Sequence, residues 1–550
     1  MSEFPADEPI DAPRRQLESP VTLSQSMIWQ VQRGFFEQQG VEAWRQAIVP
    51  QYVTSNPFIA NAYVQMVLGY LRDLRARSAP PGDPGLDPRE PLYLLELGAG
   101  SGRFGFHFLT RFFDLLPRSM ARNQTVTYLM TDLSERMVAH WAEHPAFKPW
   151  VQRGQLDFAR FDPLVDQTLT LRHSGTVVSA RTVRNPLVAI ANYFFDGIPQ
   201  DLFFLHAGQI DECLASVNAT EPDPDLSSPT ALERLDVTFH RRPVSGAAYR
   251  DAELQEILDG YRQRLRDSHL LFPVGAIQTL RHLLHLSGGR MLVLSADKGY
   301  HRESELDQRG EPEIVRHGSI SMSVNYHAMG EYVRRQGGEV LNSSHRHLGL
   351  DVVALLVGGP AGGYVDTALA FDEWVEHRGP DDFFLLNQAL RRQVSDLTLQ
   401  QILAFLRLSG WDGRVFLRCQ PTLLERVDSA SESWRREVLH ATERVWESYF
   451  PIGEQEDLAF QIGALLYRMD AFRDALRYFA RSRDSHGSDA GTLYNQAACH
   501  HALGELEAAL TLVADALLLE PTLEPALELR EQIQSTLASS RQIDGHSNPA

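Results

Sequence analysis

The sequence predicts an α/β protein in which a mainly parallel sheet with crossover helices is followed by an all-helical C-terminal domain. Apolar runs typical of buried strands alternate with amphipathic stretches between residues 92 and 357. This alternation indicates parallel strands joined by right-handed crossovers. A glycine-rich turn follows the first of these strands. From residue 455, similar residues recur 34 positions apart, which is the tetratricopeptide period and indicates paired helices.

Length, charge and cysteine content limit the possible functions. A chain of 550 residues exceeds one hydrophobic core, so we expect several domains. The formal net charge of −19 disfavours nucleic acid and anionic membranes as partners, because both are negatively charged. Three cysteines lie far apart without a C-x-x-C pair, so neither disulfides nor a zinc site is predicted. The N-terminus lacks the pattern of a signal peptide, and we expect a cytoplasmic protein.

The N-terminal segment precedes the strand around which the chain is organised. Residues 1–20 are rich in proline and acidic side chains, which predicts a disordered tail. Residues 21–84 carry apolar side chains at helical spacing, with a second helix running through Leu74. We expect this segment to form a helical cap in front of the sheet.

The strongest motif joins a predicted strand, Leu92–Leu97, to a helix that begins after Gly102. Glycines at 98, 100 and 102 can adopt positive φ angles and leave no Cβ between the backbone and a ligand. Residues 100–105 also spell G-x-G-x-x-G, the fingerprint of dinucleotide-binding loops. A glycine-rich turn without any ligand is a third interpretation.

Two features favour S-adenosylmethionine over a dinucleotide. Glu96 precedes the first glycine, where its carboxylate would repel a pyrophosphate but suits the cationic amino-acid end of S-adenosylmethionine. The next acidic strand end, Asp132, lies about thirty residues past Gly102, whereas the dinucleotide pattern places an acid about 20 residues on. We therefore predict that Glu96, Gly98, Gly100 and Gly102 bind S-adenosylmethionine.

The second and third predicted strands also end in acidic residues, at the sheet edge where open α/β folds bind ligands. Asp132 is predicted to accept from the ribose hydroxyls, and Asp162 from the adenine amino group. Either residue could instead cap a helix or stabilise a turn.

The remaining segments complete a domain predicted at 85–360. The fourth strand begins at Leu187 and leads into a polar loop that reaches Pro199. Residues 214–248 are interpreted as a surface excursion and 251–286 as helical. A fifth strand is expected at 290–299, a helix at 326–336 and a late strand at 351–357.

His345 and His347 alternate along the chain, as two metal ligands on a strand would. No third ligand is close in sequence, so we interpret them as surface histidines and predict no metal site.

Four segments resemble, in order, the MidA-type methyltransferases, relatives of the mitochondrial complex I assembly methyltransferase that modifies protein arginine. They are Thr54–Pro57, Glu96–Gly102, Asn192–Pro199 and His317–Gly318. The resemblance spans roughly residues 25–358 and implies a Rossmann-like class I methyltransferase fold with a protein substrate. The family pattern at the fourth strand is similar to N-E-x-x-D-A-x-P.

This chain keeps Asn192, Asp196 and Pro199 of that pattern, but has Tyr193 for the glutamate and Gly197 for the alanine. The glutamate that follows the segment at Thr54 in the family is also missing. The resemblance implies that Asn192, Tyr193 and Asp196 orient the methyl acceptor or help to remove its proton. We therefore predict an S-adenosylmethionine-dependent methyltransferase acting on a protein, with arginine among the candidate acceptors. The alternative is a non-catalytic adaptor or assembly factor that binds the same cofactor.

The C-terminal part is predicted to hold a helical connector at 380–450, tetratricopeptide repeats at 455–538 and a disordered tail at 539–550. Positions one repeat period apart match in size or polarity; the pairs are Phe460/Tyr494, Gly463/Ala497, Tyr467/His501, Phe472/Leu506, Ala475/Ala509 and Tyr478/Leu512. A plain helical bundle is the alternative. Repeats of this kind would hold a protein or peptide client, and the oligomeric state does not follow from the sequence.

Overall fold

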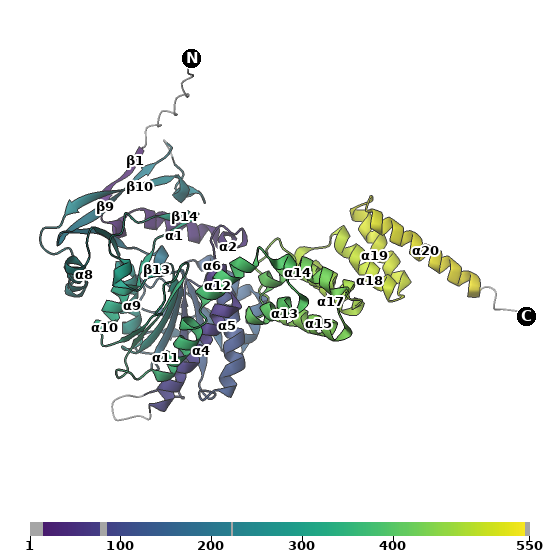
Figure 1. Cartoon of the computed structure of the whole chain (residues 1–550), viewed down its shortest axis with the longest axis horizontal. Helices are drawn as coiled ribbons and strands as arrows, with labels where there is room; N and C mark the ends of the chain where they lie inside the picture. The colour runs from purple at the N-terminus through teal and green to yellow at the C-terminus, as the bar shows by residue number, and fades with distance from the viewer. Residues whose placement is uncertain (1–14, 78–84, 222–223, 545–550) are drawn as a thin grey trace, which may run out of the picture. The chain divides into compact units, whose positions relative to one another are not determined.

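The computed structural model describes residues 15–77, 85–221 and 224–544 (Figure 1). The chain divides into two compact units, Met1–Leu385 and Leu386–Ala550. This division lies a few residues after the predicted boundary at 360–380. Among the described residues, no helix combines the length and apolarity needed to cross a membrane.

Unit 1 is built on a seven-stranded sheet with the order β17-β18-β12-β7-β2-β3-β4. Neighbouring strands from β4 to β12 are parallel, and β18 runs antiparallel to both β12 and β17. The strands are β2 (Leu92–Leu97), β3 (Val126–Asp132), β4 (Leu156–Arg160), β7 (Leu187–Asn192), β12 (Met291–Asp297), β17 (Glu339–Leu341) and β18 (Asp351–Val357). The predicted mainly parallel sheet is therefore confirmed.

The central strands are apolar because helices cover both faces of the sheet. Every residue of β2, β12 and β18 is buried, as expected for strands without a solvated face. In Figure 1 the sheet lies between α9 and α10 on one side and α4, α5 and α11 on the other. These helices are α4 (Pro57–Ala76), α5 (Arg103–Leu115), α9 (Val274–Leu286), α10 (Tyr326–Arg335) and α11 (Val365–Phe371).

A second, antiparallel sheet was not predicted. Strand β9 (Gln209–Ala219) pairs with β1 (Arg15–Val21), β8 (Asp201–His206) and β10 (Leu235–Pro243), and β8 pairs with β11 (Ser268–Phe272). The prediction of a surface excursion at 214–248 is therefore wrong. The segment predicted as helical at 251–286 is interrupted by β11. Residues 15–20 of the predicted disordered tail form a strand because β9 supplies their backbone partners. Residues 1–14 lie outside the described residues.

The N-terminal helices α1 (Ile28–Gln39), α2 (Glu42–Arg45) and α3 (Tyr52–Ser55) precede α4. Ile28 and Trp29 of α1 share an apolar cluster with Cys213 and Val217 of β9, so this helix covers the antiparallel sheet. Asn56 caps α4 by accepting from the N–H groups of Phe58 and Ile59. The described part of the segment predicted as a helical cap, 21–77, is mainly helical, and residues 78–84 lie outside the described residues. Its longest helix, α4, packs within unit 1 against α5 and α11.

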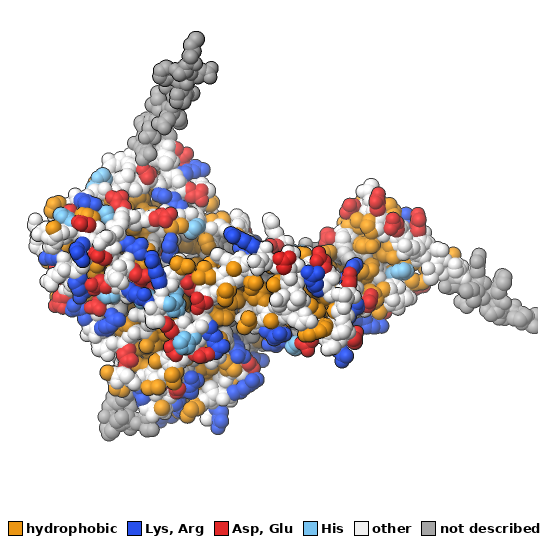
Figure 2. Space-filling model, viewed as in Figure 1, with side chains coloured by type: hydrophobic (Ala, Val, Ile, Leu, Met, Phe, Trp, Pro, Cys, Tyr) orange, Lys and Arg blue, Asp and Glu red, His pale blue; other side chains and the backbone are white. Residues whose placement is uncertain are grey.

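The remaining strands and α-helices of unit 1 are β5 (Leu169–Thr170), β6 (Val177–Val178), β13 (Gly299–Tyr300), β14 (Val315–His317), β15 (Ser319–Ser321), β16 (Val324–Asn325), α6 (Glu135–Glu143), α7 (Lys148–Gln152) and α8 (Ala252–Arg264). Of these, β13 pairs with β16, and β14 with β15. On the face shown in Figure 2, acidic and basic side chains are interspersed over unit 1.

Unit 2 is helical throughout its described elements, after α12 (Pro380–Leu390) at the boundary. The elements are α13 (Leu399–Leu408), α14 (Gly413–Val427), α15 (Glu432–Glu447), α16 (Leu458–Arg468), α17 (Phe472–His486), α18 (Ala490–Ala502), α19 (Leu506–Leu519) and α20 (Glu524–Asp544). The predicted tail at 539–550 is partly helical, because α20 runs to Asp544.

The four helices from α16 to α19 form two contacting pairs, α16 with α17 and α18 with α19. An ideal Cβ on Gly463 would lie 2.8 Å from Phe479, so a small residue lets α16 approach α17. Ala475 and Ala509, which take equivalent positions in the two pairs, are both fully buried. Small residues therefore recur where the paired helices come close.

Candidate active site

The glycine loop, residues 98–102, joins β2 to α5 at the carboxyl edge of the parallel strands. Gly98, Gly100 and Gly102 have φ angles of +59°, +51° and +81°, which side chains with a Cβ rarely adopt. A Cβ added to Gly100 would lie 2.9 Å from Trp44 Cζ2, and a Cβ added to Gly98 would lie 3.0 Å from Phe194 Cδ2. The loop therefore needs glycine for its conformation and for its close neighbours. It leads directly into the N-terminus of α5, whose N-cap is Gly102.

Glu96 lies beneath this loop and is buried. Its Oε2 accepts a hydrogen bond from the Tyr128 hydroxyl at 2.9 Å and lies 2.9 Å from the position of a Cβ on Gly105. Burial raises the pKa of Glu96 to about 8; the charge of Asp132 adds to this, and the Tyr128 hydrogen bond opposes it. An approaching cation would favour the ionised carboxylate. Whether Glu96 meets the methionyl ammonium stays a prediction.

Asp132 lies at the end of β3, close to the glycine loop. Its Oδ1 accepts from the Ser134 N–H at 2.9 Å, and its Oδ2 from the Gly100 N–H at 3.4 Å. Burial raises the pKa of Asp132 to about 6, and these N–H groups limit the rise. The structure thus gives Asp132 a turn-stabilising role beside the loop. Its predicted ribose contact remains compatible with this position.

Asp162 follows β4 and is held by the N-terminal segment. Its Oδ2 accepts from the Arg33 guanidinium of α1 at 2.6 Å, and its Oδ1 from the Leu164 N–H at 3.1 Å. The Asp162 side chain is 5% exposed. Both oxygens have protein donors, so contact with an adenine amino group would require Asp162 to share an oxygen or release Arg33. The adenine role stays a prediction.

Of the predicted catalytic residues, Asn192 ends β7, and Tyr193 and Asp196 lie on the loop that follows. This loop is next to the glycine loop, because the ring of Phe194 faces Gly98. Asn192 Oδ1 accepts from the Tyr63 hydroxyl at 2.7 Å. Tyr193 has a φ of +46°, a conformation that costs on the order of 1–3 kcal/mol and is frequent at functional sites. Burial raises the pKa of Tyr193, and nearby Asp297 and Asp196 add to the effect.

Asp196 is half-buried and lies beside a fully buried carboxyl group, that of Asp297 at the end of β12. The Asp196 N–H donates to Asp297 Oδ2 at 3.1 Å. Burial raises the pKa of Asp196. Burial raises that of Asp297 as well, and the Asp196 charge adds to it. Two neighbouring carboxyl groups repel each other when both are ionised, so this carboxyl pair favours a state with one proton while no cation is bound.

Sequence reasoning missed Asp297 and Tyr63. Asp297 could have been found by the rule that identified Asp132, because it too ends a buried strand at the carboxyl edge. Tyr63 offered no local signal, since it lies in α4, far along the chain from its partner Asn192. The segment at Thr54 does reach the site, because the Asn192 amide donates to the Thr54 carbonyl at 3.5 Å.

Residues 84–312 match a protein family described as "Putative S-adenosyl-L-methionine-dependent methyltransferase". The matched segment contains every predicted cofactor residue and the loop after β7. It confirms the predicted cofactor, S-adenosylmethionine. With the strand order above, it also establishes a mixed α/β, methyltransferase-like fold followed by a helical region. No significant match is found among curated proteins.

Among solved structures, the chain is similar to two from Burkholderia thailandensis. One is a "likely methyl transferase" bound to S-adenosyl-homocysteine, with 15% identity, coverage of 66% of this chain and 91% of that chain, and a TM-score of 0.40. The other, an uncharacterised protein, has 14% identity, the same coverage and a TM-score of 0.38.

The chain is also similar to YrrB, described as a TPR protein with an unusual peptide-binding site. The identity is 18%, the coverage 31% of this chain and 82% of that chain, and the TM-score 0.23. The fold assignment rests on the strand order of this chain and its family match rather than on these three structures.

Proposed function

We propose that this chain is an S-adenosylmethionine-dependent methyltransferase whose acceptor is a cationic nitrogen of a protein, with arginine as the best-fitting side chain. The observation that carries this proposal is the carboxyl pair of the half-buried Asp196 and the buried Asp297 beside the glycine loop. Two carboxylates can hold and orient a guanidinium through charge-assisted hydrogen bonds. Asp297 supplies the second carboxylate, the group that Tyr193 does not provide.

The charge of the carboxyl pair fits such an acceptor. Burial disfavours ionisation of both aspartates while no cation is present. A bound guanidinium or ammonium would stabilise the ionised form of both, so the pair would lose its proton when the cation binds. A neutral hydroxyl acceptor would give no such compensation, which is why a cationic nitrogen is favoured.

The chemistry that follows needs mainly positioning. S-Adenosylmethionine, when bound, would supply an electrophilic methyl group, and the residues of this chain would place the acceptor nitrogen in line with it. The Asp196 and Asp297 carboxylates would hold the nitrogen and accept the proton that it loses. Asn192 is held by hydrogen bonds to Tyr63 and Thr54 and would help to orient the acceptor.

We further propose that unit 2 recruits the protein acceptor through tetratricopeptide repeats. Two successive helix pairs, α16–α17 and α18–α19, occur at the repeat spacing, and small residues lie buried where the helices approach. Consecutive pairs of this kind form surfaces that hold an extended peptide or a helix. A tethered recruitment surface would raise the effective concentration of a weakly bound acceptor.

One substitution favours the alternative, a non-catalytic adaptor that binds the same cofactor. Tyr193 stands where the MidA-type pattern has a glutamate. A labelling experiment separates the two functions: methyl-labelled S-adenosylmethionine is incubated with cell extract and the wild-type chain, Gly100→Val or Asp196→Ala. Transfer of label to a protein by the wild type alone supports the enzyme. Tight S-adenosylhomocysteine binding without transfer supports the adaptor.

A further inference from the structure

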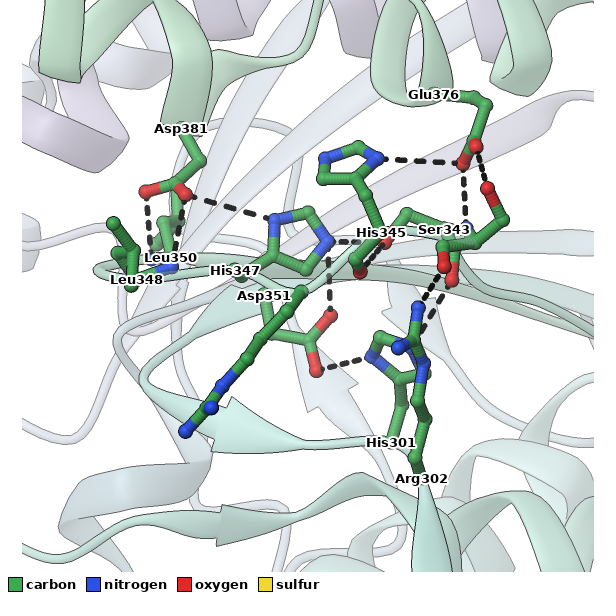
Figure 3. A network of polar contacts seen from close by, with 12 residues as sticks. His301, Arg302, Ser343, His345, His347, Leu348, Leu350, Asp351, Glu376 and Asp381 are labelled. Atoms are coloured by element: carbon green, nitrogen blue, oxygen red, sulfur yellow. Dashed lines mark hydrogen bonds and ion pairs between the residues drawn. The ribbon is translucent and has the colours of Figure 1, made fainter. Parts of the chain in front are cut away.

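His301, His347 and Asp351 meet in a buried cluster on the strand edge next to the carboxyl pair (Figure 3). His301 follows β13, His347 lies between β17 and β18, and Asp351 is the first residue of β18. One ligand atom from each lies within 4.8 Å of the others. The interpretation of His347 as a surface histidine is therefore wrong: its side chain is 6% exposed. The third ligand, which sequence reasoning did not identify, is Asp351, four residues after His347.

The distances are close to those of a metal site. His301 Nδ1 lies 2.7 Å from Asp351 Oδ2, and His347 Nε2 lies 3.7 Å from Asp351 Oδ1. Ligand atoms bonded at about 2.0–2.1 Å around a tetrahedral ion are separated by roughly 3.3 Å. Both histidine–carboxylate distances are therefore within about 0.6 Å of this value, and all three ligand atoms lie within 4.8 Å of one another.

The outer sides of both rings are arranged as the second shell of a metal site usually is. His301 Nε2 lies 3.1 Å from the Ser343 carbonyl oxygen, and His347 Nδ1 lies 3.8 Å from Asp381 Oδ2. Metal-bound histidines commonly donate their other N–H to a carbonyl or a carboxylate, which fixes the ring and its tautomer. Asp381 in turn accepts from the N–H groups of Leu348, Gly349 and Leu350, and so holds the segment that carries His347.

The cluster is not satisfied by its own hydrogen bonds. Asp351 Oδ1 is buried without a hydrogen-bond partner among the described residues, and so is His347 Nδ1. The Ser343 hydroxyl contacts His347 Nε2 and also reaches the His345 carbonyl. A buried carboxylate oxygen without a partner is destabilising, and a bound cation would remove that cost.

We propose that His301, His347 and Asp351 bind a divalent transition-metal ion of the zinc class. Two imidazoles and one carboxylate suit Zn²⁺, Co²⁺ or Fe²⁺ rather than Mg²⁺ or Ca²⁺, which prefer oxygen ligands only. Three protein ligands leave at least one position open. The ion would lie beside the proposed acceptor site, because Asp351 and Asp297 are directly paired across β18 and β12.

Cobalt(II) absorption tests this site on the intact chain. The wild-type protein is treated with a chelator, dialysed and titrated with Co²⁺, followed by Zn²⁺ or Mg²⁺. We expect visible absorption that saturates at one Co²⁺ per chain, is displaced by Zn²⁺ and is unaffected by Mg²⁺. The absence of saturable absorption in the folded wild type would overturn the proposal without any variant.

Three variants localise the ion: His347→Gln, Asp351→Asn and the matched control His345→Gln. His345 lies two residues before His347, and its side chain is 34% exposed. We expect at least a 100-fold loss of Co²⁺ affinity for the first two variants and an unchanged titration for the control. Circular dichroism verifies the fold of each. Equal affinity in all three would place the ion elsewhere and refute the site.

Discussion

The two halves of the candidate active site are specified in different ways. The cofactor half lies mostly within one stretch, where Glu96 and three glycines with positive φ angles connect β2 to α5. The acceptor half is assembled from α4, the loop after β7 and the end of β12. A local motif can be recognised from backbone requirements alone. A distributed cluster becomes visible only when the fold brings its side chains together.

If the cofactor half depends on glycine, Gly100→Val should have the largest effect. The substitution forces a β-branched residue to a φ of +51° and places its Cβ 2.9 Å from Trp44. We expect methyl transfer to be abolished and S-adenosylhomocysteine affinity to fall at least about 100-fold, or about 2.7 kcal/mol. Isothermal titration calorimetry measures this.

The matched control is Gly154→Val. Gly154 also has a positive φ, +67°, but an added Cβ would find nothing within 4 Å. It should lower stability while leaving cofactor affinity intact. Equal loss of affinity in both variants would mean that strain anywhere in the fold, not the loop, controls binding.

Asp297→Asn tests the acceptor half separately. The amide keeps the shape of the carboxyl group but removes the second charge, so kcat/KM should fall by about 100-fold, the lower range for a group that moves a proton. S-Adenosylhomocysteine affinity should change by less than a factor of three. Asp225→Asn, at an exposed site, is the control. Parallel loss of cofactor binding would show that the two halves are not independent.

Deletion of residues 455–550 asks whether the repeats deliver the acceptor. Cofactor affinity should remain, and labelling of the natural partner should fall about tenfold or more as the effective concentration is lost. The melting temperature is the control for a purely stabilising role. Full partner labelling by a stable truncated chain would refute recruitment.

Proton release on cofactor binding tests Glu96. Its pKa of about 8 lies above the ordinary value of 4.5, so the carboxyl is mostly protonated at pH 7 before the cofactor binds. If the cofactor's ammonium lowers this pKa, binding near pH 7 should release up to about one proton. Calorimetry in buffers of different ionisation enthalpy measures the release, and Glu96→Gln should abolish it. Unchanged release in that variant would assign the proton elsewhere.

The same shift has a consequence for stability. Because the folded pKa is the higher one, the contribution of Glu96 to the free energy of unfolding is present in full below about pH 4.5. It is lost as the pH rises towards 8, by up to about 1.4 kcal/mol per pH unit.

The smallest effect is expected at Asp162. Its carboxylate already accepts from Arg33 and from the Leu164 N–H. Asp162→Asn should therefore lower the affinity for S-adenosylmethionine by only about fivefold, or roughly 1 kcal/mol. Arg33→Gln separates the roles: a gain in affinity would show that Arg33 competes for the carboxylate. No change in either variant would remove Asp162 from the cofactor site.

The sequence predicted the parallel sheet and the glycine-rich turn, because each has a local cause. Buried strands are continuously apolar, and glycines lie where φ is positive. Asn192, Tyr193 and Asp196 were predicted through a family resemblance, and their roles stay predictions. The sequence did not predict the antiparallel sheet, because β1 and its partner β9 are far apart in the chain. Asp297 and the cluster around Asp351 were missed for the same reason. Strand order, which no local pattern encodes, decides which polar residues meet at the sheet edge.

The most direct test of the proposed function is to locate the transferred methyl group. The full-length wild-type chain is incubated with methyl-labelled S-adenosylmethionine and cell extract, and labelled peptides are sequenced by mass spectrometry. The carboxyl pair of Asp196 and Asp297 predicts label on an arginine nitrogen, or on another cationic nitrogen, of a protein. Label only on an oxygen atom, or no label while the cofactor binds tightly, would contradict it.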